Sequence, residues 1–475
     1  LPLVQRHILI SGNALTMNKY IAAALTGAVV LMSACQDNPT APSQDRVVAG
    51  SQQTLQSLVS GIVAQDRGNV GGSYGSWGSI MARDAIQPNG NEQRTLTEFY
   101  VTPPDPSDFI GRSQWDGYYT MLRASKNLLK DASFKALSSG DQAATRGFVN
   151  TLGGLAYIRL IEYRDQRGAV VQGPDGTVMD PIRQKQSVLK YASALLDSAY
   201  TDLQAASASV PFTLPSGYKL HGDYTLTANL KKLNRGLKGK VEVMRALDAV
   251  APNAGSAAAA ITALNIALAD APTPVNQEYL NTGPWYQYNP SAPESTPNPL
   301  PSSSSLLTDN FVANIMPGDL RAAQIIPAAK VTVAGYSGQW RLKSTDPTNA
   351  ALQSAPMPAV TNTEFFLLRA QAEIATGDLL SATNDINAVH TVAGGLAPYT
   401  PFLTPAAAIA AVLYEYRYSF AYLGPQHIVA LREYGMFNTT YTSQPGMPTT
   451  VVLVQDLPIP LTEINARNGD VTPVP

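Results

Sequence analysis

The sequence predicts an all-α protein made of stacked helical hairpins, with long irregular loops and minor β-hairpin content. Apolar side chains recur at helical spacing along several segments, and capping or breaking residues bound most of these segments. Between them, 68–108 and 276–305 are rich in Gly, Pro, Ser and aromatic residues and show almost no helical period. Because compact domains seldom keep such long loops without a role, we expect the functional site in these two stretches.

The predicted helices follow one another along the chain, and each has one apolar face. The first follows Ser113, a predicted N-cap, and places Trp115 on the apolar face, where we expect the indole in the core. The last begins with Thr404 as N-cap and Pro405 at the first helical position. A Gly-flanked segment at 336–340 with two aromatic residues, Tyr336 and Trp340, predicts the β-hairpin. The other segments with a helical period are 141–155, 187–203, 226–250 and 257–271.

The most specific local pattern lies at 364–389. Gly377 and Asp378 end one predicted helix and begin the next, and Ala382 and Ile386 follow five and nine residues after the glycine. This spacing is that of the middle of a tetratricopeptide repeat, where a small residue lets two antiparallel helices approach and a larger one fills the next layer. We therefore expect tetratricopeptide-like stacked hairpins.

The N-terminal part has the pattern of a lipoprotein signal, and it holds the only cysteine of the chain, Cys35. A basic start at Met17 and an apolar run over 21–32 precede two small residues, and lipid transfer requires the thiol that follows them. The alternative is an ordinary secreted protein in which Cys35 is a buried thiol. The predicted segments are upstream translated sequence at 1–16, a signal peptide at 17–34, a lipidated tether at 35–48 and a binding domain at 49–475.

Composition excludes several classes of function. Charged residues make up 14% of the chain, against about 25% in an average domain, and the net charge of −2 provides no basic surface for nucleic acid. Beyond the signal, no apolar run reaches the roughly 18 residues of a membrane-spanning helix. The four histidines lack metal-ligand spacing, so we predict neither a metal site nor a cofactor. Residues 71–75 match the nucleophile-elbow pattern but follow a polar stretch instead of a buried strand, so we predict no enzyme.

Several short motifs occur in order through the mature part of the chain. They are Trp115, Tyr119, Leu122 and Asn127 in the first helix; Asp319 and Arg321; the repeat-like segment 364–387; and Leu457-Pro458-Ile459-Pro460 with Glu463, Ile464 and Asn465. Together they resemble the motifs of the SusD/RagB family of outer-membrane nutrient-binding lipoproteins. The match is less close in the charged C-terminal helix over 415–432, where several positions that are usually charged are not.

The resemblance implies a ligand site formed by aromatic residues of the two irregular stretches. A sugar ring has apolar C–H faces and a fringe of hydroxyls, so a capture site needs exposed aromatic planes beside amides or carboxylates. The alternative is that the tryptophans have a structural role and fill gaps between the loops and the helices. The candidate ligand-binding residues are Tyr74, Trp77 and Asp84 in the first stretch and Trp285, Tyr286 and Tyr288 in the second.

The resemblance also implies a function: a lipid-anchored outer-membrane protein at the cell surface that captures an oligo- or polysaccharide. The glycan would pass to a SusC-like TonB-dependent outer-membrane transporter, without any chemical step. Two alternatives stay open, a peptide ligand for the same kind of uptake system and a helical-repeat scaffold of the envelope without a nutrient ligand. The scaffold predicts that Trp77 and Trp285 are both buried, so their exposure helps to separate these functions.

Overall fold

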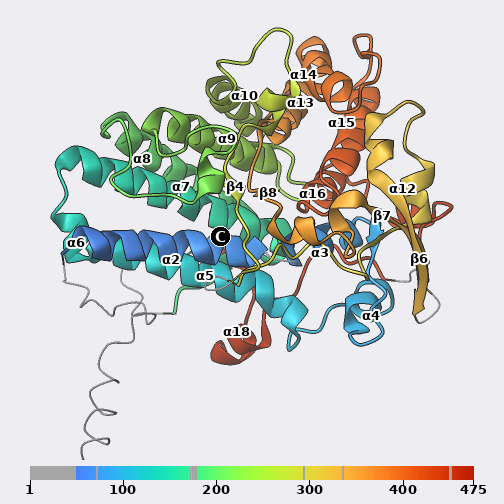
Figure 1. The fold of residues 1–475 in the computed structure, drawn as a ribbon, viewed down its shortest axis with the longest axis horizontal. Helices are drawn as coiled ribbons and strands as arrows, with labels where there is room; N and C mark the ends of the chain where they lie inside the picture. Colours follow the sequence, from blue (N-terminus) through green and yellow to red (C-terminus); the bar gives the residue numbers. More distant parts are fainter. Residues whose placement is uncertain are drawn as a thin grey trace, which may run out of the picture. The chain divides into compact units, whose positions relative to one another are not determined.

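In the computed structural model, which describes residues 50–70, 73–171, 173, 179–291, 295–333, 336–448 and 452–475, helices pack side by side largely in sequence order (Figure 1). Contacts run from α2 to α5, from α5 to α7, through α8, α9 and α10 to α13, and on through α14 to α15. The helices of this stack are α2 Gln52–Val70, α5 Phe109–Lys130, α7 Ser139–Arg164, α8 Lys185–Gln204, α9 Thr227–Ala246, α10 Gly255–Ala267, α13 Asn362–Thr376, α14 Leu379–Val392 and α15 Pro405–Ser419. The all-α prediction is confirmed.

Shorter elements connect and cover the stack. The short α-helices are α3 Ser73–Met81, α4 Arg94–Tyr100, α6 Ala132–Lys135, α11 Gln277–Asn281, α12 Asp309–Ala313, α16 Gln426–Glu433, α17 Thr439–Thr442 and α18 Leu461–Ala466. The 3-10 helices are η1 Asp165–Arg167, η2 Ser216–Lys219, η3 Leu320–Gln324, η4 Lys343–Thr345 and η5 Ala350–Ser354. The predicted cysteine anchor, signal peptide and tether all lie before residue 50, outside the described residues.

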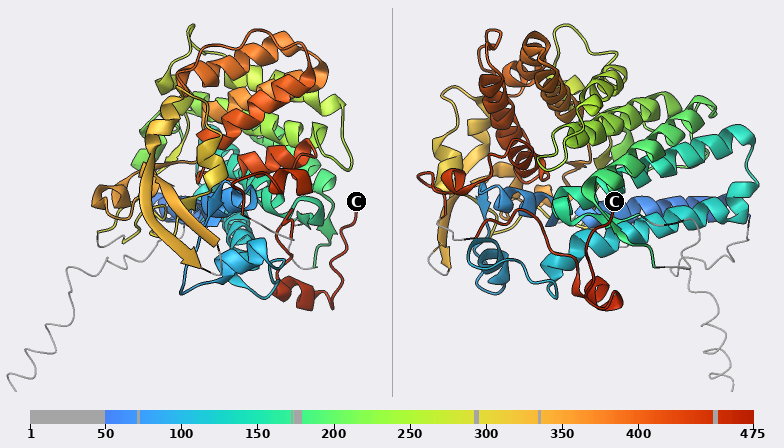
Figure 2. Two further views of the ribbon diagram at one scale, coloured as in Figure 1. Left: turned by 90° about the vertical axis from the view of Figure 1, so that its right-hand side faces the viewer. Right: turned by 180° about the vertical axis from the view of Figure 1, so that it is seen from behind.

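Strands are few and mostly short. The strands are β1 Ala85–Ile86, β2 Ala169–Val170, β3 Ile182–Arg183, β4 Trp285–Tyr286, β5 Leu306–Leu307, β6 Ile325–Val333, β7 Tyr336–Leu342 and β8 Met357–Pro358. The largest sheet has the order β1-β5-β7-β6, and all its pairs are antiparallel. The predicted hairpin is confirmed as β6–β7, which lies at the end of this domain opposite to α6 (Figure 1, Figure 2).

Glycines allow neighbouring helices of the stack to approach closely. A Cβ atom at Gly147 would lie 2.6 Å from Leu203 Cγ, and one at Gly154 would lie 2.6 Å from Leu196 Cδ2. Residues early in α7 thus face residues late in α8, which makes the two helices an antiparallel hairpin. A Cβ at either glycine would force the helices apart.

The α13–α14 hairpin forms where the sequence predicts it. Gly377 ends α13 in the left-handed conformation, with φ of 84°, and Asp378 caps α14 by accepting a hydrogen bond from the Ser381 amide at 3.1 Å. Ala382 and Ile386 are fully buried against the neighbouring helices. The tetratricopeptide-like interpretation of this segment is confirmed.

Gly377→Val should lower the free energy of unfolding by about 1–2 kcal/mol, because a residue with a Cβ is strained in the left-handed conformation. No atom lies within 4 Å of a Cβ built on Gly377, so crowding adds nothing. Urea unfolding followed by circular dichroism measures the change. Gly377→Asn is the matched control, because asparagine tolerates this conformation, and equal losses in both variants would contradict the explanation.

Two boundary predictions are wrong. The stretch 68–108 holds the end of α2 and the two helices α3 and α4, and its Gly75 serves close packing: a Cβ at Gly75 would lie 1.9 Å from the Tyr422 carbonyl oxygen. The helix α5 begins at Phe109, ahead of the predicted cap Ser113, because Asp108 accepts a hydrogen bond from the Ile110 amide at 3.0 Å. Among the described residues of 276–305, α11 and β4 are the only helix and strand, and the rest is irregular. The prediction of a long irregular connection here is therefore confirmed.

Candidate functional site

The structure buries five of the six candidate ligand-binding residues. The exposed fractions are 3% for Tyr74, 4% for Trp77, 1% for Asp84, 2% for Tyr286 and 3% for Tyr288. The prediction that these aromatic rings are exposed for stacking is wrong. Trp115, predicted to be a core residue, is buried as expected.

Two of the tyrosines pair with buried charges of the helix stack. The Tyr286 hydroxyl donates to Asp66 at 2.8 Å, and Asp66 forms an ion pair of 2.6 Å with Arg159. The Tyr74 hydroxyl donates to Glu162 at 2.7 Å. Burial raises the pKa of the Tyr74 hydroxyl well above its usual range, and the nearby Glu162 carboxylate adds to the shift. These phenols therefore satisfy core carboxylates, which accounts for their burial.

Trp77 fills a gap between helices, which is the structural role that the alternative interpretation predicts for it. Its ring lies 6.2 Å from that of Phe99 in α4 and 6.1 Å from that of Phe109 in α5. Asp84 is also held by the core, with Arg417 at 2.8 Å and His427 at 2.5 Å from its two carboxylate oxygens.

Trp285 differs from the other candidates because its indole is only half-buried. The Nε1 atom donates to the Asn281 carbonyl at 3.0 Å, and the ring packs on His221 with the centroids 4.8 Å apart. The strand β4, paired with β8, fixes the backbone on both sides. The ring is thus held in one orientation while part of its surface stays open.

Trp285 lines a cavity of about 550 Å³, and also a smaller one of about 200 Å³ that Tyr286 shares. No other candidate residue lines the larger cavity. The apolar lining includes Trp285, Leu300, Phe311, Ile325, Leu342 and Phe420, and the polar lining includes Gln277, Gln324, Ser344, Thr361 and Ser419. A predominantly apolar cavity with a few amides and hydroxyls suits an uncharged polyhydroxylated ligand. We refer to it below as the Trp285 cavity.

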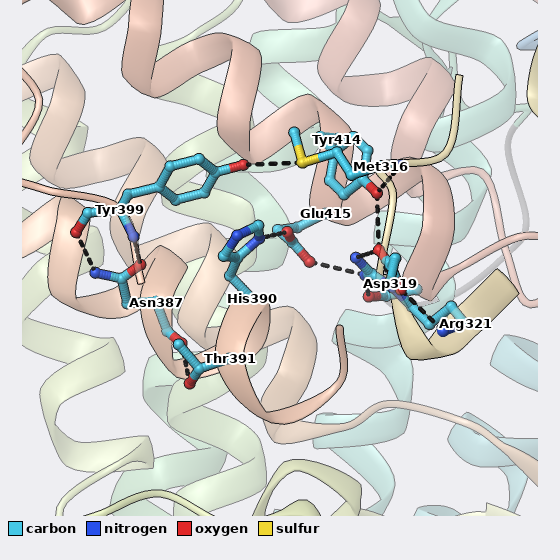
Figure 3. Close-up of polar contacts among 10 residues, drawn as sticks. Met316, Asp319, Arg321, Asn387, His390, Thr391, Tyr399, Tyr414 and Glu415 are labelled. Atoms are coloured by element: carbon cyan, nitrogen blue, oxygen red, sulfur yellow. Dashed lines mark hydrogen bonds and ion pairs between the residues drawn. The ribbon is translucent and has the colours of Figure 1, made fainter. Parts of the chain in front are cut away.

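The Asp-x-Arg motif contributes Arg321 to the lining of the Trp285 cavity. Figure 3 shows Arg321 with Asp319, Tyr414 and Glu415. Arg321 donates to both Asp319 oxygens, at 2.7 Å through Nη2 and 3.0 Å through Nε, and its Nη1 donates to Glu415 at 2.7 Å and to Ser419 at 2.9 Å. Tyr414 donates to Asp319 at 2.7 Å. Burial alone would raise the pKa of Asp319, but the hydrogen bonds from Arg321 and Tyr414 outweigh it and lower the pKa.

The same network continues away from the cavity to α14. His390 Nδ1 lies 2.7 Å from Glu415, and the imidazole stacks on Tyr399 with the centroids 4.1 Å apart (Figure 3). The sequence predicts His390 as a polar residue at a helix end; it does lie in the last turn of α14, but it is buried. Most donors of Arg321 are used by protein acceptors, so the network forms a rigid part of the cavity wall.

Within the described ranges, no three His, Cys, Asp or Glu side chains gather as metal ligands. No helix of the described chain combines the length and apolar character needed to cross a membrane. The fold and the cavity together define a tetratricopeptide-like helical protein with a partly open, mainly apolar cavity.

Comparisons of the fold identify this class more closely. A SusD-like carbohydrate-binding protein from Bacteroides vulgatus superposes with a TM-score of 0.64 at 14% identity, over 90% of this chain and 99% of its own. A SusD superfamily protein from Parabacteroides distasonis has a TM-score of 0.64 at 13% identity, over 88% and 98%. Surface glycan-binding protein A from Bacteroides thetaiotaomicron has a TM-score of 0.62 at 11% identity, over 87% and 97%.

No family model and no curated protein sequence matches the chain. The structural matches nevertheless extend over almost the whole of the solved proteins. The chain has the SusD-type fold, which confirms at the level of fold the resemblance that the sequence motifs indicate.

Proposed function

We propose that this protein binds a glycan in the Trp285 cavity. The observation that carries the proposal is the half-buried indole, held by the Asn281 carbonyl and His221, on the lining of an otherwise mainly apolar cavity. Two proteins of the same fold are described as carbohydrate-binding and glycan-binding. The indole would stack on the C–H face of a sugar, and Gln277, Gln324 and the hydroxyls would bond to its oxygens.

We further propose that the protein is a lipoprotein of the outer-membrane surface that passes its glycan to a SusC-like TonB-dependent transporter. Support for the anchor comes from the sequence alone, in the basic start, apolar run and small residues before Cys35. Support for the transporter comes from the SusD/RagB resemblance of the motifs. Binding without catalysis fits the rigid, hydrogen-bonded wall of the cavity.

Trp285→Ala should weaken binding of a glycan that the wild-type chain binds by about tenfold, the loss expected from about 1.4 kcal/mol of stacking. Because the ring is only half-buried, the free energy of unfolding should change far less than for a core tryptophan. Isothermal titration calorimetry and urea unfolding on the same sample measure both quantities.

Trp77→Ala is the matched control, because Trp77 is buried between two helices and lies outside the cavity. It should lower the free energy of unfolding by about 3–5 kcal/mol and leave the affinity of the folded protein unchanged. Unaltered affinity in Trp285→Ala would place the site elsewhere and contradict the proposal.

A further inference from the structure

A second cavity, of about 680 Å³, lies beside α15, α16 and α17. It shares only Tyr418 with the Trp285 cavity, and it contains none of the six candidate residues. Its walls include the rings of Tyr414, Tyr418 and Tyr441, and its polar lining includes Arg417 and His427. We call it the Arg417 cavity.

The tyrosines that line the Arg417 cavity have their hydroxyl hydrogens bound by protein acceptors. Tyr414 donates to Asp319 at 2.7 Å, Tyr418 to the Phe311 carbonyl at 2.9 Å and Tyr441 to the Ala82 carbonyl at 3.1 Å. The Tyr414 and Tyr418 rings also contact each other, with centroids 4.6 Å apart. These contacts fix the rings as apolar surfaces on which a ligand can pack.

Asp84 positions the two nitrogen-bearing side chains that complete the cavity. One carboxylate oxygen accepts a hydrogen bond from Arg417 Nε at 2.8 Å, and the other lies 2.5 Å from His427 Nδ1. Arg417 Nη2 donates to Asn310 at 2.7 Å. Since both side chains bind one carboxylate, they lie next to each other with fixed orientations.

One nitrogen of each side chain is left without a protein partner. In the described part of the chain, neither Arg417 Nη1 nor His427 Nε2 has a hydrogen-bond partner, although both side chains are nine-tenths buried. Arg417 Nη1 is a donor. With Nδ1 directed at Asp84, His427 has Nε2 left for a ligand hydroxyl, which can donate to or accept from an imidazole nitrogen. The Arg417 cavity therefore combines a guanidinium donor, an adjacent imidazole nitrogen and tyrosine side chains.

We propose that the Arg417 cavity is a second sugar-binding site, which takes the vicinal diol of a neutral sugar unit. One hydroxyl accepts from Arg417 Nη1, its neighbour forms a hydrogen bond with His427 Nε2, and the apolar face of the sugar ring packs on the tyrosines. The ligand class rests on the proposed function, whereas the site is separate from the Trp285 cavity. Two sites on one chain would let successive parts of a polysaccharide bind together and raise the overall affinity.

Substitutions at the rim test this site without disturbing the core. Ala410, an exposed residue of α15, lines the cavity, so Ala410→Trp should fill it. Met436, 41% exposed, lines the cavity from another segment, and Met436→Trp provides a second blocking variant. Ala259→Trp, at an exposed position of α10 that lines neither cavity, is the matched control.

The measurement is saturation-transfer NMR of the full chain in detergent with methyl glycosides of glucose, galactose, mannose and glucuronic acid. In a Trp285→Ala background, at least one neutral glycoside should still receive saturation. Ala410→Trp and Met436→Trp should each abolish that signal, and Ala259→Trp should leave it intact. Unfolding curves of all variants establish that the folded state persists.

Each outcome separates this site from the proposed function. Loss of all binding with Trp285→Ala alone supports the Trp285 cavity and overturns the second site. Loss with the rim variants alone supports the second site and contradicts the first. Binding of only the glucuronide would show recognition of a carboxylate and overturn the diol assignment, and no binding to any probe would overturn the proposal.

Discussion

Arg159→Ala should lower the free energy of unfolding by about 3–5 kcal/mol, which is a large part of the stability of a typical domain. The Arg159 guanidinium and the Asp66 carboxylate are each 1% exposed and lie 2.6 Å apart. Removal of the arginine leaves the Asp66 carboxylate buried. The Tyr286 hydroxyl still donates a hydrogen bond to it, but no counterion remains beside it from this pair. A buried charge without its counterion is costly because the interior solvates it poorly.

The control is a partly exposed ion pair between α7, the helix that also holds Arg159, and α8. Arg146 and Asp202 lie 2.7 Å apart, with exposed side-chain fractions of 38% and 18%, so Arg146→Ala should cost only about 0–1 kcal/mol. Urea unfolding followed by circular dichroism compares the two variants. Similar small losses in both would mean that Asp66 is not held in the core as described.

Cys35→Ala should abolish membrane association while the folded domain persists. A diacylglycerol thioether together with an amide-linked chain provides two hydrophobic anchors, and a protein without them has no comparable affinity for the bilayer. Fractionation of cell envelopes, with detection of the protein in each fraction, measures the effect. Met32→Leu, which restores the residue usual three positions before the lipidated cysteine, is the control and should stay membrane-bound. Wild-type retention of Cys35→Ala would contradict the lipid anchor.

Features specified by nearby residues could be predicted from the sequence. The α13–α14 hairpin depends on Gly377 and Asp378, which act within a few positions along the chain. Thr404 likewise caps α15, accepting a hydrogen bond from the Ala407 amide at 3.3 Å. Such signals need no knowledge of tertiary packing, and the order of the hairpins follows from them.

Features that depend on contacts between distant segments could not be predicted in the same way. The glycines near Trp77 indicate a loop by composition, whereas Gly75 lets α3 approach the backbone at Tyr422. Tyr286 is buried because Asp66, 220 residues away, accepts its hydrogen bond. Of the aromatic candidates, only Trp285 combines a fixed ring with an open surface, and its sequence context does not distinguish it from Tyr286 beside it.

The two alternative functions fit the structure less well. A scaffold without a nutrient ligand predicts that both Trp77 and Trp285 are buried, but only Trp77 is. A peptide ligand would favour an exposed strand edge for backbone pairing. The lining of the Trp285 cavity includes the indole, amides and hydroxyls, which suits a sugar, and the edge strand β6 contributes only Ile325 to it.

The most direct test of glycan capture is incubation of the purified full chain, in detergent, with an array that carries both glycans and peptides. We expect retention on at least one glycan, reduced retention there by the Trp285→Ala variant, and no retention on the peptides. Retention on peptides alone, or on nothing, would contradict the proposed function.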